Sequence, residues 1–199
     1  MSLLYVFATR DSVVMVGDYR RYMMKGPAEI DGQFNFDAVE GYMDNAPKAY
    51  KANNNFIIGC VGHCIPVLDE LIKLIAKSTI MSFEGAFRTV KEFMDFHRPN
   101  MKRFKTAVII GGLTASRKTV ISIFRTDREE SENVFNPQEI VYVGTCAGMN
   151  PEQWIDRRIE GITGTKDELE ILCHDLAEYV SSHDWLVSKK HNVFSLAVS

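Results

Sequence analysis

The first eighteen residues constrain the fold most, because they read as two strands joined by a tight turn. Residues 3–8 and 12–18 are rich in β-branched and aromatic side chains, and the polar break at residues 9–11 contains an aspartate. Two such runs around a short polar break predict a β-hairpin. We therefore expect the chain to begin inside its own sheet, with no leading arm.

Ser2, at the start of this hairpin, is a residue that could take part in catalysis. Its small side chain is of the kind that permits removal of Met1. If Met1 is removed, Ser2 carries a free α-amino group, a hydroxyl and a fixed place on a strand. Because an α-amino group has a pKa of about 7.7–8.0, it suits a general base near neutral pH. Ser2 is therefore a candidate nucleophile with its own base.

Length and composition predict an ordinary globular protein. The chain has 199 residues, 46% hydrophobic and 25% charged, which fits one domain over residues 1–199 with a single core. The net charge of −3 gives no basic face, so we expect no nucleic-acid partner. Residues 3–8 lack a basic leader, and no run reaches the roughly 18 apolar residues of a membrane span. We expect a cytoplasmic protein without membrane contact.

The cysteines and glycines indicate no cofactor. Without a secretory signal, Cys60, Cys64, Cys146 and Cys173 are expected to be reduced thiols. His63 lies beside two of them, but no second ligand pair follows at a standard spacing, so we expect no structural zinc. The sequence also lacks a phosphate-binding glycine loop and a Gly-x-Ser-x-Gly elbow.

Beyond the hairpin, pairs of strands alternate with pairs of helices. Alternation and helical spacing predict strands over residues 48–52, 56–61, 105–113, 119–125, 140–143 and 192–198. Helices are expected to start near Ile65, after Ser82, from Pro151 and after Thr165, with Pro99 closing the second. Adjacent helix pairs argue against a doubly wound sheet. They favour an α+β fold, a four-layer αββα sandwich with two antiparallel sheets between helix pairs.

Two segments are predicted to be loops. Residues 19–47 are dominated by turn formers, and Asp31-Gly32 is compatible with a small hairpin inside this long excursion. A loop of this length in a compact domain is usually functional or makes an intersubunit contact. Residues 127–136 are read as a charged loop.

An acyl-transfer site can be assembled around Ser2. The hairpin would return Asp18 to the chain start, and Lys48, entering the next strand, could reach both. The Lys48 ammonium would lower the pKa of the Ser2 amine, and Asp18 would hold that ammonium. The N–H of Gly59 could meet an oxyanion. Lys51 is a competing lysine, Gly59 could serve only close packing, and Asp18 could simply cap a turn.

Six short motifs follow one another along most of the chain: Ser2 to Asp18-Tyr19-Arg20, Pro47-Lys48-Ala49-Tyr50, Ile58-Gly59-Cys60-Val61-Gly62, Val108-Ile109-Ile110-Gly111-Gly112, Val143-Gly144-Thr145 and His183-Asp184. In this order, they resemble the motifs of the proteasome β-subunit and HslV-type peptidases, which belong to the N-terminal nucleophile hydrolases.

The resemblance implies further roles and partners. Thr145 would supply a hydroxyl near the amine of the nucleophile, and Asp184 is similar to the aspartate that follows the last helix of the family. The implied activity is cleavage of peptide (amide) bonds in peptide or protein substrates. The implied assembly is a homo-oligomeric ring, with an ATPase unfoldase as a possible partner.

The sequence also departs from the family pattern. The nucleophile is Ser2 rather than threonine, Tyr22 replaces an expected threonine, and the serine expected after Asp184 is one step late, at Ser188. Residues 19–47 are longer than the corresponding family segment. Two alternatives therefore stay open: a non-catalytic structural ring subunit and a small-molecule amidase on the same scaffold.

Overall fold

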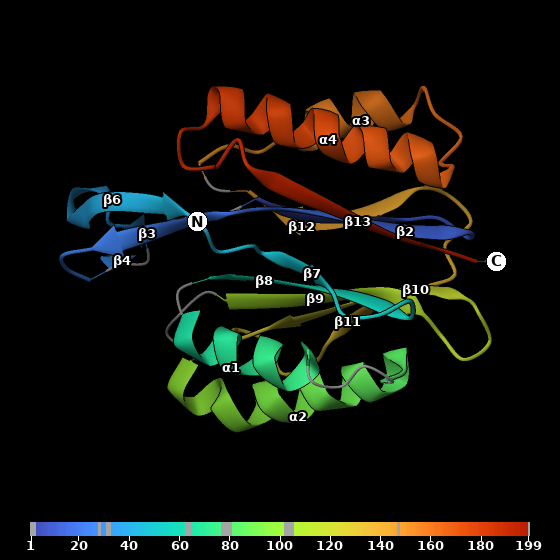
Figure 1. Ribbon diagram of the computed structural model, residues 1–199, viewed down its shortest axis with the longest axis horizontal. Coiled ribbons are helices and arrows are strands. Elements are labelled where there is room, and N and C mark those ends of the chain that lie inside the picture. The colour runs from blue at the N-terminus through green and yellow to red at the C-terminus, as the bar shows by residue number, and fades with distance from the viewer. Residues whose placement is uncertain are drawn as a thin grey trace.

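The computed structural model describes residues 3–27, 29–30, 33–62, 65–76, 81–101, 106–146 and 148–198. Two antiparallel sheets lie between helices that cover their outer faces (Figure 1). The helices are α1 (Ile65–Ala76), α2 (Phe83–Met101), α3 (Glu152–Ile159) and α4 (Lys166–His183), with a 3-10 turn at Phe36–Ala38. The strands are β1 (Leu4–Ala8), β2 (Ser12–Asp18), β3 (Arg20–Met24), β4 (Glu29–Ile30), β5 (Gln33–Phe34), β6 (Val39–Asp44), β7 (Ala49–Lys51), β8 (Phe56–Gly62), β9 (Thr106–Leu113), β10 (Thr119–Arg125), β11 (Glu132–Phe135), β12 (Val141–Thr145) and β13 (His191–Ala197).

The predicted opening hairpin is confirmed. β1 and β2 pair antiparallel from Leu4 opposite Gly17 to Ala8 opposite Val13. They form the middle of a four-stranded sheet with the order β12-β1-β2-β13. Every residue of both strands is buried, because other elements cover both faces of this sheet. The hairpin is therefore the centre of the fold.

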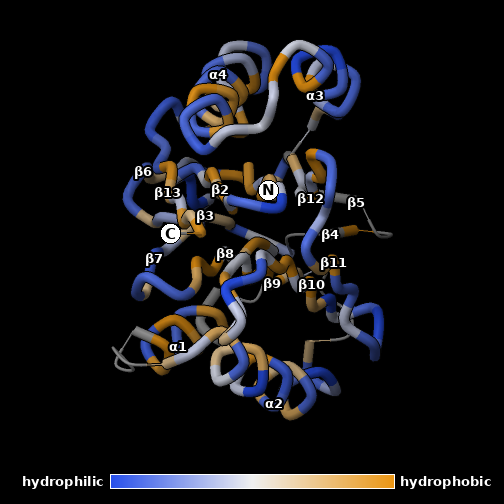
Figure 2. Tube along the Cα trace, turned by 90° about the vertical axis from the view of Figure 1, so that its right-hand side faces the viewer, coloured by the Kyte–Doolittle hydropathy of each residue, from blue (hydrophilic) through white to orange (hydrophobic). Residues whose placement is uncertain are grey.

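The second large sheet has the order β11-β10-β9-β8-β7. Its inner face packs on the first sheet through an apolar cluster that includes Leu4, Met15, Ile57, Ile109 and Ile121. Figure 2 shows β8 and β9 between the four-stranded sheet and the helices α1 and α2. Ile58 and Ile110 belong to the cluster on the helix side, and Ile57 and Ile109 to the cluster between the sheets. Strand alternation thus gives each buried sheet two apolar faces, one toward the other sheet and one toward helices.

The helices close the outer faces. Leu71 and Val90 of α1 and α2 belong to the cluster on the five-stranded sheet, and Leu172 and Val180 of α4 belong to the cluster on the four-stranded sheet. Helix α4 starts at a capping box, as its sequence predicts: the Thr165 hydroxyl accepts from the Glu168 amide, and the Glu168 side chain accepts from the Thr165 amide. No helix among the described residues is both long and apolar enough to cross a membrane.

Residues 19–47 are more ordered than their composition predicted. β3 and β6 pair antiparallel and extend beyond the main sheets as a two-stranded arm (Figure 1). β4 and β5 form the small hairpin, although its turn residues Asp31 and Gly32 lie outside the described residues. The turn-forming residues at the bends of this arm dominate its composition, so the short strands between them were not predicted from the sequence.

Two other predictions were wrong. The charged loop at 127–136 contains β11, because Val134 packs toward the core between the sheets and the strand pairs with β10. Pro99 does not end α2, which continues to Met101. Met101 is buried and the Arg98 guanidinium donates to the Arg125 carbonyl, so tertiary contacts hold a last turn that lacks one N–H.

Gly59 offers a test of sheet packing. A Cβ at this position would lie 2.4 Å from Leu4 Cδ1 and 3.0 Å from Met15 Sδ, so Gly59→Ala must displace core side chains. We expect a loss of about 1–3 kcal/mol in the free energy of unfolding, measured by urea titration. Gly161→Ala is the control, because its Cβ would meet nothing nearer than 3.8 Å. Equal stability of the two variants would contradict this packing.

Candidate active site

The centre of the candidate site is the Asp18 carboxylate at the end of β2, which is fully buried. Its Oδ1 accepts the Leu3 N–H at 3.1 Å, and its Oδ2 accepts the N–H groups of Arg20 and Ser188, each at 3.1 Å. Burial raises the pKa of Asp18, and these donors together with the Lys48 charge oppose that rise. Three distant segments therefore meet on one side chain.

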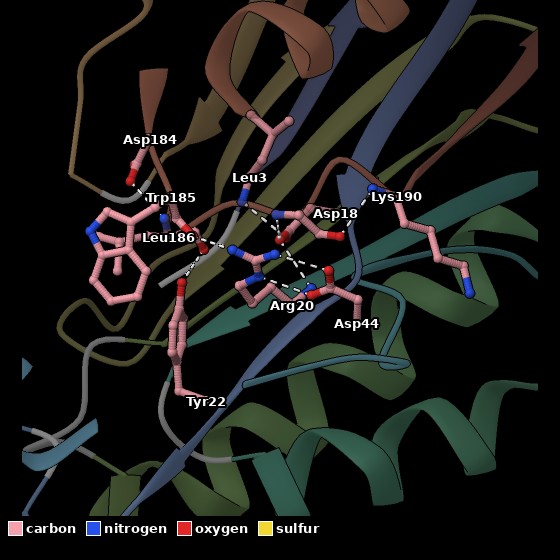
Figure 3. Close-up of polar contacts among 10 residues, drawn as sticks. Leu3, Asp18, Arg20, Tyr22, Asp44, Asp184, Trp185, Leu186 and Lys190 are labelled. Atoms are coloured by element: carbon pink, nitrogen blue, oxygen red, sulfur yellow. Dashed lines mark hydrogen bonds and ion pairs between the residues drawn. The ribbon is translucent and has the colours of Figure 1, made fainter. Parts of the chain in front are cut away.

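The candidate nucleophile Ser2 lies outside the described residues. Its neighbour Leu3 is fully buried, donates to Asp18 through its amide and accepts the Asp18 N–H through its carbonyl at 3.1 Å. Figure 3 shows the Leu3 amide directed at the Asp18 carboxylate. The chain enters the fold beside this carboxylate, as the hairpin requires.

Lys48 precedes β7 and is 9% exposed. Its N–H donates to the Asp18 carbonyl at 3.0 Å, which holds the two residues side by side. No ion pair within 4.0 Å joins the Lys48 ammonium to the Asp18 carboxylate in the described part of the chain, so the two groups interact through charge at longer range. Burial lowers the pKa of Lys48, and the Asp18 charge partly restores it.

A narrow pocket of about 20 Å³ adjoins Lys48, with room for about one water molecule. Tyr50 and Cys60 line it, together with Arg21 of β3 and Asp69 of α1, whose side chains form an ion pair at 3.3 Å. Burial raises the pKa of the Cys60 thiol to about 12, so this thiol is protonated at neutral pH. The lysine thus lies in a small, largely enclosed space.

Gly59 is near Lys48 in the sheet but does not line that pocket. It lies opposite Ala49, and the next amide, that of Cys60, donates to the Lys48 carbonyl at 2.9 Å. Since successive N–H groups of a strand point to opposite sides, the Gly59 N–H points toward β9. There it pairs with Ile109, and a Cβ at Gly59 would meet Leu4 and Met15, so the position is closely packed.

Thr145 and Asp184 approach the same region from the four-stranded sheet and α4. Thr145 is the last residue of β12, pairs with Leu4 and is half-buried. Asp184 caps the end of α4, is 7% exposed, and accepts the Leu186 N–H through Oδ1 at 2.9 Å. Its buried Oδ2 has no hydrogen-bond partner among the described residues. Burial raises the pKa of this carboxyl.

A clamp of polar contacts joins the arm to the loop after α4 (Figure 3). The Arg20 guanidinium makes two hydrogen bonds of 2.9 Å with the Asp44 carboxylate and also donates to the Trp185 carbonyl. The Tyr22 hydroxyl donates to the Leu186 carbonyl. The root of the arm therefore fixes the loop that carries both Asp184 and the Ser188 amide.

Several of these residues escaped the sequence analysis as site components. Asp44 and Trp185 act across long sequence separations, and no local pattern marks them. Tyr22 stands at the family threonine position, but nothing in the sequence indicates its contact with the Leu186 carbonyl. Ser188 lies one residue after the position of the family serine, but it is fully buried and its N–H donates to the Asp18 carboxylate. Its position after a helix-ending aspartate is the one signal that could have found it.

Comparison with known proteins supports the fold. No family model matches the sequence, and no curated protein matches it either. The structure is similar to the crystal structure of eukaryotic HslV from Trypanosoma brucei, with a TM-score of 0.58 and 15% identity over 98% of this chain and 99% of that chain. The resemblance read from the sequence is therefore supported at the level of the fold.

The buried lysine predicts a pH dependence of stability. Because the folded-state pKa of Lys48 lies below its ordinary value of 10.5, the unfolded chain binds more protons between these two values. Stability of the wild type, relative to Lys48→Met, should therefore rise with pH up to about 10.5. Urea titrations from pH 8 to 10.5 measure this difference.

Lys51→Met is the matched control for Lys48→Met. Lys51 lies three residues later, in β7, with an exposed side chain, so Lys51→Met removes a lysine without removing a buried one. A stability difference between wild type and Lys48→Met that does not change with pH would contradict the burial of the Lys48 ammonium.

The clamp predicts a cost for losing Asp44. Asp44→Ala leaves the Arg20 guanidinium, whose side chain is 9% exposed, without its carboxylate partner. We expect a loss of about 1–3 kcal/mol in unfolding free energy, since hydrogen bonds to charged groups are among the stronger ones. Asp175→Ala removes the exposed Arg158–Asp175 pair and should cost about 0–1 kcal/mol. Calorimetry measures the unfolding of both variants. Similar losses of unfolding free energy for Asp44→Ala and Asp175→Ala would argue against the clamp.

Proposed function

We propose that this protein is an N-terminal nucleophile hydrolase that cleaves peptide (amide) bonds, built as a four-layer αββα sandwich. Ser2, exposed by removal of Met1, is the proposed nucleophile. The observation that carries the proposal is the hydrogen bond from the Leu3 amide to the buried Asp18 carboxylate, beside Lys48. The fold similarity to HslV gives independent support.

The proposed reaction proceeds through an acyl-enzyme. The Ser2 hydroxyl oxygen attacks the scissile carbonyl carbon, and its proton passes to the Ser2 α-amine. The tetrahedral intermediate then breaks its C–N bond, and the leaving amine takes that proton. Water, deprotonated by the same amine, attacks the ester carbonyl, which releases the acid and restores the Ser2 hydroxyl.

The surrounding residues would adjust this chemistry electrostatically. A cationic Lys48 would lower the pKa of the α-amine and stabilise developing negative charge, and Asp18 would compensate the lysine charge. Thr145 and Asp184 are proposed to orient the amine from the opposite side. We do not assign the oxyanion role to Gly59, because its N–H is directed toward its partner strand β9.

We further propose a cytoplasmic, homo-oligomeric ring that acts on peptides or unfolded proteins, with an ATPase unfoldase as a possible partner. These proposals rest on the HslV-like fold and not on a contact within this chain. Multi-angle light scattering of the natural-length protein would test the oligomer.

The nucleophile is tested by Ser2→Ala, which keeps a small second residue and hence removal of Met1. We expect cleavage of a fluorogenic peptide panel to fall about a thousandfold or more, since removing a nucleophile abolishes the covalent route. Intact mass must show the loss of Met1 in both proteins. Ser116→Ala, at an exposed turn, should keep full activity. Cleavage that survives Ser2→Ala would refute the assignment.

The small pocket at Lys48 favours a second candidate, a non-catalytic ring subunit. About 20 Å³ between Arg21, Tyr50 and Asp69 leaves little room for a substrate side chain. Retention of Met1 on the natural protein would support this candidate and exclude Ser2 chemistry. Ser2-dependent cleavage of small amides, but not of peptides, would instead support an amidase.

A further inference from the structure

A second pocket, of about 190 Å³, opens between the two large sheets at the end where Thr145 lies. Its walls come from the ends of β8, β9, β10 and β12. Its apolar residues are members of the cluster between the sheets, whereas Cys60 and Leu68 of the Lys48 pocket belong to the cluster under α1 and α2. Val61 lines both pockets. None of the contacts that hold the Asp18 network uses this space.

The inner part of the pocket is apolar. Val61, Ile109 and Ile123 line it and are at most 7% exposed, and Ala107 adds a small wall residue. These side chains continue the core between the sheets up to the surface. An aliphatic group entering here would exchange water contact for contact with methyl groups.

One cation lines the same pocket with an unused donor. The Nε of Arg125 is buried and has no hydrogen-bond partner among the described residues. Its ion-pair partner, Glu132 Oε1, lies at 3.8 Å, beyond hydrogen-bond distance. The Arg125 side chain is 37% exposed as a whole, but its Nε is enclosed. A buried N–H without an acceptor is costly, and a carboxylate is the acceptor that matches it best.

The spacing of these groups sets the length of a ligand. Ile123 and Arg125 are two residues apart on one face of β10, so their side chains leave the strand about 6.6 Å apart. A carboxylate at Arg125 would therefore place its fourth or fifth carbon near Ile123. Thr145 adds a hydroxyl-bearing side chain to the lining, and Asp127 adds an exposed carboxylate.

We propose that this pocket binds an aliphatic group of four to five carbons that ends in a carboxylate. The terminal carboxylate of a chain that ends in leucine has this chemistry. A glutamate side chain offers the same carboxylate on a shorter aliphatic stem, because its fourth carbon is already the Cα. Because Thr145 pairs with Leu4 beside the chain start, the pocket would serve as a substrate or product subsite, and that role rests on the proposed function. The binding of the ligand to this pocket does not depend on the proposed function.

The test uses full-length Ser2→Ala protein with labelled isoleucine methyl groups, so binding is read without catalysis. Titration with 4-methylpentanoate should shift the Ile109 and Ile123 methyl signals saturably. 4-Methylpentanamide should bind about tenfold more weakly, because it lacks the charge that the guanidinium recognises. Peptides with an internal glutamate or a terminal leucine carboxylate then distinguish the two sources.

Variants separate recognition from loss of structure. Arg125→Gln should weaken the carboxylate about tenfold, whereas Arg88→Gln makes the same charge change at an exposed site on α2 and should have no effect. Asp127→Asn should tighten binding, since it removes a like charge beside the ligand. Equal affinities for the acid and the amide, or no shift at either methyl, would overturn the proposal whether or not Ser2 proves catalytic.

Discussion

The structure depends on one buried carboxylate. Asp18 can remain in a solvent-free position because amides from the chain start, the arm and the loop after α4 converge on it. Loss of the Leu3 donor would leave the buried Oδ1 unsatisfied, and loss of either of the other two would halve the bonds to Oδ2, at a cost in free energy. Since the donors are backbone groups of Leu3, Arg20 and Ser188, the geometry does not depend on which side chains stand there. This explains how the displaced Ser188 is accommodated.

Around this carboxylate, burial rather than close ion pairing sets the electrostatics. Desolvation is the main cause of the raised pKa of Asp18 and Asp184 and of the lowered pKa of Lys48. In each case burial disfavours the charged form, and the opposing charges only moderate the effect. Shifts of the pKa caused by burial are common at functional sites, and structural groups show them as well. The Arg20–Asp44 pair, at the edge of this region, remains charged and serves structure.

Local sequence patterns predicted the elements whose structure depends on interactions between residues close in the chain. The opening hairpin, the paired helices and the Thr165 cap follow from periodicity and from capping chemistry within a few residues. The arm, β11 and the end of α2 were missed because pairing partners and tertiary contacts decide them. In the site, the hairpin register was enough to place Asp18 beside the chain start. The contacts of Tyr22 and Asp44 with distant residues left no trace in the sequence.

The hydrogen bond between the Lys48 amide and the Asp18 carbonyl has a consequence for how this chain can vary. This bond joins the residues that flank residues 19–47, so the arm leaves the fold and returns to it at one place. The tip of the arm therefore does not determine where Lys48 lies. Insertions or deletions beyond the Arg20–Asp44 root would change the reach of the arm and leave the position of Lys48 intact. The fold can therefore acquire new surfaces here through changes in length alone.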